Sequence, residues 1–121
     1  MTTVLSAFNN QLFLFLDDLI TVFPEDNDFK TAKTSLELLK KTNPRKILEL
    51  FRSYVVPYHD LIMSKNEDFF LNESFDHLGG GEKGWVITSK LKNYWREISE
   101  KNKETIWKYF EILLLLNNKY N

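Results

Sequence analysis

The chain has 121 residues, of which 43% are hydrophobic and 15% are aromatic, and it carries a net charge of −1. This length and apolar content suit a single domain with a buried core and exclude a disordered chain. The absence of cysteine excludes disulfide bonds, thiolate nucleophiles and cysteine zinc sites.

The first predicted helix starts after Thr2 or Thr3, either of which is placed to cap it, and it ends at Pro24. Its apolar residues recur every three or four positions, which is the spacing of one helix face. They are Leu5, Phe8, Leu12, Phe15, Leu16, Leu19 and Phe23, and the face is widened by Phe13, Leu14 and Ile20. A face this wide predicts contacts with neighbouring helices on two sides.

The second and third predicted helices each follow a capping signal. Asp26 or Asp28 is placed to accept the first free amides of the second helix, which is short and amphipathic. The sequence TNPRK puts Asn43 at the cap of the third helix and Pro44 in its first turn. Pro57 then interrupts the apolar phase of the third helix, so we expect a kink or a break just before it.

Apolar periodicity fails over residues 66–84 and returns at Ile87. Residues 87–118 are predicted as one bent helix or as two helices, the second of which Ser99 would cap. Within 106–116 only Lys108 and Glu111 are charged. A helix that is apolar nearly all round is typical of the centre of a bundle, and we expect this one there.

These patterns predict an all-α fold, because no alternating run long enough for a strand is present. We expect one domain, 1–121, built as a compact bundle of four to five helices. Its N-terminal helices would lie within 3–65 and its C-terminal helices within 85–118, joined by an irregular glycine-rich loop at 66–84.

All four glycines lie in the sequence HLGGGEKGW, and three of them form the pattern Gly79-x-Gly81-x-x-Gly84. A dinucleotide-binding motif needs such glycines between a buried strand and a helix, and no strand is predicted here. We therefore interpret them as a hinge between two helical groups. In the alternative interpretation the loop becomes ordered against a partner, and its candidate partner-facing aromatic residues are Phe69, Phe70, Phe75 and Trp85.

Two histidines lie beside aspartates, as His59 with Asp60 and Asp76 with His77. A metal site needs three or four converging ligands, whereas these pairs fall on a predicted helix and in the loop, so we predict no metal and no cofactor. Adjacent carboxylates elsewhere point in different directions on a helix, and no serine has a nucleophile-elbow setting. We predict no catalytic residue, no small-molecule substrate and no enzymatic activity.

Positive charge is concentrated in residues 30–52, which hold seven basic and two acidic residues, whereas residues 1–28 hold five acidic residues and no basic one. Nucleic-acid binding depends largely on such charge. Candidate contacts for a nucleic acid or another polyanion are Lys33, Lys40, Lys41, Arg45, Lys46 and Arg52. The same residues could instead complement the acidic segment, remain solvated, or bind an acidic protein partner.

No membrane span is expected, because the apolar run ILLLL at Ile112 to Leu116 is far shorter than the roughly 20 residues that cross a bilayer. The N-terminal segment carries no Lys or Arg before Lys30, and Asp17 and Asp18 cut its apolar run, unlike a signal peptide. We therefore expect an intracellular, cytoplasmic protein.

Three stretches carry a resemblance to a known group of proteins: FNNQLFLFLDDLITVFPEDNDFKTAKTSLELLKKTNPRKILELF, YWREIS and NKETIWKYFEILLLL. Together they are similar to small uncharacterised proteins encoded by large DNA viruses of algae and protists. The resemblance implies a viral, intracellular setting and brings no activity or site residue with it.

The aromatic content is more than one small core is expected to bury, and excess apolar surface is the usual mark of a protein partner or of self-association. We therefore predict a non-enzymatic protein-interaction or assembly module that binds a protein partner or associates with itself as a homo-oligomer. The alternative prediction is a protein that binds nucleic acid or another polyanion through the basic segment.

Overall fold

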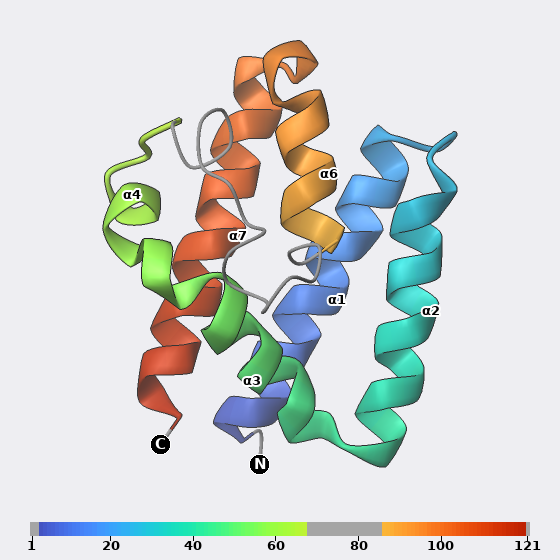
Figure 1. Ribbon diagram of the computed structural model, residues 1–121, viewed down its shortest axis with the longest axis vertical. Coiled ribbons are helices and arrows are strands. Elements are labelled where there is room, and N and C mark those ends of the chain that lie inside the picture. Colours follow the sequence, from blue (N-terminus) through green and yellow to red (C-terminus); the bar gives the residue numbers. More distant parts are fainter. Residues whose placement is uncertain (1–2, 68–85, 121) are drawn as a thin grey trace.

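The computed structural model describes residues 3–67 and 86–120, with the side chains of 86–89 excepted. Within these residues it contains helices and no strand, so the predicted all-α bundle is confirmed. Five α-helices of nine or more residues, α1, α2, α3, α6 and α7, make up most of the described part, together with the short α4 (Figure 1). No helix in this part of the chain is long and apolar enough to cross a membrane.

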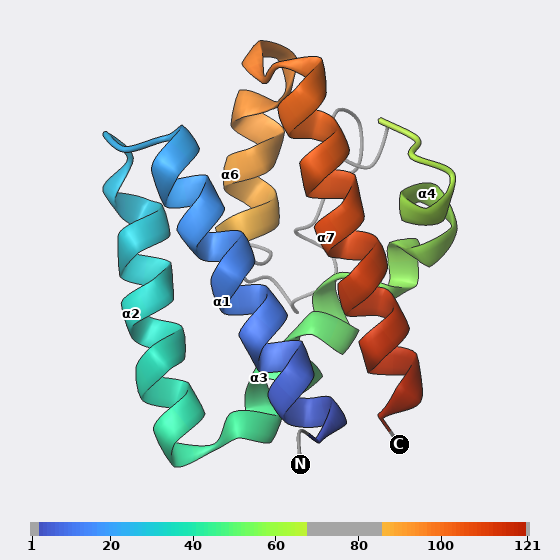
Figure 2. The same ribbon diagram turned by 180° about the vertical axis from the view of Figure 1, so that it is seen from behind.

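Helix α1, Val4–Val22, begins and ends where the sequence predicts. The Thr3 hydroxyl accepts a hydrogen bond from the Ser6 amide at 3.0 Å, and the helix stops before Pro24. Helix α2, Asn27–Thr42, begins at the predicted Asp26 cap, whose carboxylate accepts from the Asp28 amide at 2.9 Å. The two helices run antiparallel, side by side in both views (Figures 1 and 2).

Helix α3, Pro44–Tyr54, has Pro44 in its first turn as predicted, where the missing N–H costs no hydrogen bond. Asn43 occupies the predicted cap position, and its side chain makes no capping hydrogen bond there. The predicted break near Pro57 is present: α3 ends at Tyr54, the 3₁₀ turn η1 spans Val56–Tyr58, and α4, His59–Met63, follows in a new direction.

The C-terminal part contains two helices and not one bent helix. Helix α6, Val86–Tyr94, runs into the 3₁₀ turn η3, Trp95–Glu97, and the chain is then extended at Ile98. Helix α7, Glu100–Lys119, begins at the predicted Ser99 cap, whose hydroxyl accepts from the Asn102 amide at 3.2 Å. It runs antiparallel to α1 and lies beside it (Figure 2).

The core forms where α1, α3 and α7 meet, and α1 touches α2 and α3 as well as α7, which confirms the predicted contacts on more than one side. Aromatic rings join these helices: Phe8 meets Phe51 edge-on at 5.1 Å, and Phe15 stacks on Tyr109 at 4.9 Å between ring centres. Burial of large side chains at this density is the main source of the fold's stability.

Helix α7 is not the central helix, so the prediction from its apolar sequence is wrong. Ile112 is 39% exposed and Leu115 is 55% exposed, while Phe110, Leu113 and Leu114 are buried. The helix lies between α1 and α4 on one face of the bundle, and no described helix covers its outer side (Figure 2). An apolar residue is not driven inward unless a neighbouring element is there to cover it.

Several predictions fall on residues 68–85, outside the described part of the chain. These are the glycine pattern and hinge, the aspartate and histidine at 76 and 77, and the four candidate partner-facing aromatic residues, Phe69, Phe70, Phe75 and Trp85.

Candidate functional site

An open groove of about 650 Å³ runs between α1 and α2. One wall comes from α1 and the other from α2, at positions three, four and seven apart that share one helix face. The lining residues are Asn10, Phe13, Leu14, Asp17, Lys33, Glu37, Lys40 and Lys41.

The α1 wall of the groove has two apolar residues at its centre, Phe13 and Leu14, between Asn10 and Asp17. Phe13 is partly buried against the core, whereas Leu14 is 51% exposed. Both belong to the set that makes the apolar face of α1 wider than its neighbours can cover. A leucine left half in water beside a phenylalanine provides an apolar contact point for another molecule.

Charged residues of the groove divide into a paired end and an unpaired end. At one end Lys33 Nζ lies 2.5 Å from Asp17 Oδ1, and this hydrogen bond raises the pKa of Lys33. At the other end Lys40 Nζ lies over the Phe13 ring, 5.4 Å from its centre. Among the described residues, neither Lys40 nor Lys41 makes an ion pair, so this end of the groove keeps uncompensated positive charge.

The structure separates the six basic residues that the sequence singles out for polyanion binding. Three of them, Lys33, Lys40 and Lys41, line the groove. Arg45 and Arg52 lie instead near the ring of Tyr120, with guanidinium carbons 5.8 and 5.7 Å from its centre. The sixth, Lys46, is exposed.

Arg52 ties α3 to the C-terminal end of α7. Its Nε donates to Asn117 Oδ1 at 2.6 Å, and its Nη2 donates to the backbone oxygens of Asn117 and Tyr120. Arg45 Nε donates to the Tyr120 hydroxyl at 2.8 Å. A cation at the C-terminal end of a helix binds its unpaired carbonyls and is attracted by the negative end of its dipole. The contacts of Arg52 therefore stabilise the end of α7, which is a structural role.

A second polar cluster holds α6 against the turn between α1 and α2. Lys90 Nζ lies 3.1 Å from Asp26 Oδ2 and 2.9 Å from Asp28 Oδ2, and the Tyr94 hydroxyl donates to Asp26. Burial raises the pKa of Asp26, but the hydrogen bonds from Tyr94, the Asp28 amide and Lys90 outweigh it and leave the pKa below its ordinary value. The hydrogen bonds to Asp28 and Asp26 raise the pKa of Lys90.

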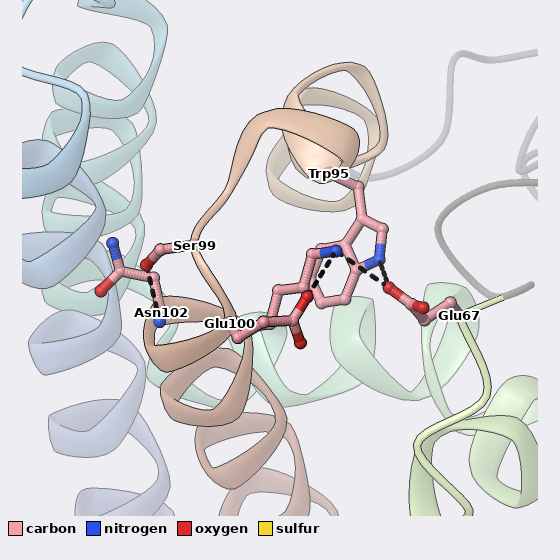
Figure 3. A network of polar contacts seen from close by, with 6 residues as sticks. Glu67, Trp95, Ser99, Glu100 and Asn102 are labelled. Carbon is pink, nitrogen blue, oxygen red and sulfur yellow. Dashed lines mark hydrogen bonds and ion pairs between the residues drawn. The ribbon is translucent and has the colours of Figure 1, made fainter.

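A third cluster joins Glu67, which lies in the segment after α4, to η3 and α7 (Figure 3). The buried Trp95 indole Nε1 donates to Glu67 Oε2 at 2.5 Å, and Lys103 Nζ lies 3.1 Å from the same oxygen. These hydrogen bonds, first from Trp95 and then from Lys103, lower the pKa of Glu67. Trp95 also meets Trp107 edge-on at 5.3 Å. The cluster holds Glu67 against η3 and α7.

A smaller cavity of about 260 Å³ lies between α1 and α7. The Tyr109 hydroxyl donates to Asp18 Oδ2 at 2.5 Å in its lining. Burial, aided by that hydrogen bond, raises the pKa of Tyr109 to about 12. A phenol held protonated in this way does not serve as a base near neutral pH.

Ligands for a metal do not gather in the described part of the chain. His59 Nδ1 lies 3.3 Å from Asp60 Oδ1, and both side chains are open to solvent. Within residues 3–67 and 86–120, no group of three or more histidine or carboxylate side chains is close enough to hold an ion.

Comparison of the chain with protein-family models, with curated proteins and with solved structures finds no match.

Sequence reasoning found the lysines of the groove but not its α1 wall. Asn10, Leu14 and Asp17 were not predicted as site residues, although Leu14 belongs to the set that widens the apolar face of the first helix. That excess width is the sequence signal for the groove.

Proposed function

We propose that the protein is a non-enzymatic interaction module that docks a segment of a partner protein in the groove between α1 and α2. The observation that carries this proposal is the 51% exposed Leu14, which lies beside Phe13 in an open groove of about 650 Å³. An apolar contact point surrounded by polar and charged groups is the arrangement found at protein interfaces.

The polyanion alternative has less support. Arg45 and Arg52 are engaged by Tyr120 and the end of α7, and Lys33 is paired with Asp17. A phosphate backbone would have to compete with these contacts. Of the six candidate residues, Lys40, Lys41 and the exposed Lys46 are the ones with neither an ion pair nor a side-chain hydrogen bond among the described residues, which is a small footprint for a nucleic acid.

The proposal is tested by site-specific crosslinking. A photoreactive phenylalanine analogue replaces Leu14 in one variant and Leu38 in a control variant, and both proteins are irradiated in the cells that make them. Leu38 is a matched control because it is an exposed leucine of α2, 61% exposed, that does not line the groove. We expect a defined crosslinked protein from position 14 and none of it from position 38.

Two results would contradict the docking function. One is equal crosslinking from both positions, which would mean that Leu14 marks no specific contact. The other is tight binding of labelled DNA or RNA with a steep salt dependence that is lost on Lys40→Glu with Lys41→Glu, which would favour the polyanion alternative. A crosslinked product of twice the chain's mass would identify the partner as a second copy, as an assembly module requires.

A viral, intracellular setting belongs to this proposal through the resemblance to virus-encoded proteins. The mass and sequence of the crosslinked partner test that setting directly.

A further inference from the structure

We infer that the segment docked in the groove between α1 and α2 is an acidic amphipathic helix of a partner protein. This inference rests on the docking function proposed above and names the chemistry of the partner.

The dimensions of the groove favour a helix of about two turns. Its α1 wall runs from Asn10 to Asp17 and its α2 wall from Lys33 to Lys41. At about 1.5 Å per residue, these walls are roughly 10–12 Å long, the length of two helical turns. A helix laid between two helices presents anchors at positions three and four apart, which match the spacing of the groove's own residues.

The two apolar residues of the α1 wall, Phe13 and Leu14, favour an occupant with an apolar stripe of its own. Phe13 and Leu14 are neighbours on α1 and face the groove, with the exposed half of Leu14 available for contact. An occupant that buries this leucine with one or two of its own leucine or phenylalanine side chains removes apolar surface from water on both partners.

The charged residues of the groove favour an occupant whose polar residues are negatively charged. Asp17 and Lys33 neutralise each other at one end. Lys40 and Lys41 lie in the last turn of α2 at the other end, and neither has an acidic partner within the described residues. Glu37 is the only other carboxylate of the lining, so the groove carries three lysines against two acids. A carboxylate on the occupant gains at the lysine end, whereas a basic occupant is repelled there.

The inference is tested with a peptide library displayed on a fixed single-helix scaffold, with the surface positions randomised. The library is selected on the wild-type protein and counter-selected on Leu14→Ser, which removes the apolar contact without adding charge to the groove. We expect enriched sequences that combine a stripe of Leu or Phe with Asp or Glu at one end. We expect Lys40→Glu with Lys41→Glu to weaken the best binder about tenfold or more in low salt, and less in high salt.

A matched double variant separates local from general charge effects. Lys101→Glu with Lys108→Glu changes the net charge by the same amount at exposed lysines of α7, outside the groove. We expect it to leave the affinity within about twofold, since exposed charges far from the contact are screened. Far-UV circular dichroism of every variant shows that the fold is retained.

The outcomes distinguish this inference from the docking function. Enriched sequences that are neutral or basic but still need Leu14 would overturn the acidic partner and leave the docking function standing. An equal loss of affinity in the two double variants would overturn the acidic partner as well. No binder that depends on Leu14 would overturn both.

Discussion

Replacing Arg52 with Met is expected to lower the free energy of unfolding by about 2–3 kcal/mol. The guanidinium group donates to Asn117 Oδ1 at 2.6 Å and to backbone oxygens at the end of α7, and it joins this end to α3. Met keeps much of the apolar length of the side chain, so the loss reports mainly on the charged group.

The magnitude follows from what the substitution leaves behind. Asn117 is 4% exposed, so its side-chain oxygen would remain buried without a donor, at a cost of about 1–3 kcal/mol. Removing a cation from the end of a helix costs about 0.3–1 kcal/mol more. We add nothing for the two backbone oxygens, because water reaches such groups at a helix end.

Urea unfolding followed by circular dichroism measures this loss, and thermal unfolding should show a fall in Tm of roughly 10 °C. Arg45→Met is the control, because Arg45 is exposed and makes one hydrogen bond to the Tyr120 hydroxyl besides its ring contact; we expect it to cost less than about 1 kcal/mol. Equal losses from the two variants would refute the assignment of Arg52 as the residue that holds the end of α7.

Three further predictions test other contacts. Ser99→Ala should cost about 1 kcal/mol, measured by urea unfolding, while Asn43→Ala should cost clearly less, because only Ser99 makes a capping hydrogen bond; the reverse order would contradict the cap geometry. The raised pKa of Tyr109 means that the folded state keeps this proton longer than the unfolded state, so stability should fall as pH rises from 10 to about 12, and Tyr109→Phe should flatten that fall. The lowered pKa of Asp26 has the opposite effect: its contribution to stability is present above the ordinary pKa of 3.8 and is lost as pH falls through the lower pKa of the folded state. Asp26→Asn should therefore flatten the acid limb of a curve of stability against pH. An unchanged limb would argue against the contacts of Asp26.

The sequence predicts the local features of the fold well, because their causes lie within a few residues of each other. Thr3, Asp26 and Ser99 each accept a backbone amide two or three positions away, and Pro57 breaks the helical pattern at its own position. Such signals need no knowledge of the tertiary arrangement.

The features that the sequence does not predict depend on residues far apart in the chain. The contact between Lys103 and Glu67 spans 36 residues, and that between Tyr94 and Asp26 spans 68. The exposure of Leu115 and the groove beside Leu14 depend on which neighbours lie against α7 and α1 and on how closely they approach. Apolar periodicity identifies the helix face that is favourable to bury, but it does not indicate whether neighbouring helices are present to bury all of it.

The pairing of α1 with α7 also has a consequence for how the protein is made. Asp18 and Tyr109, which join the two helices, are 91 residues apart. Synthesis proceeds from the N-terminus, so the apolar side of α1 leaves the ribosome long before the helix that covers it exists. The nascent chain must keep that side from aggregating, by transient local contacts or with a chaperone, until translation reaches α7.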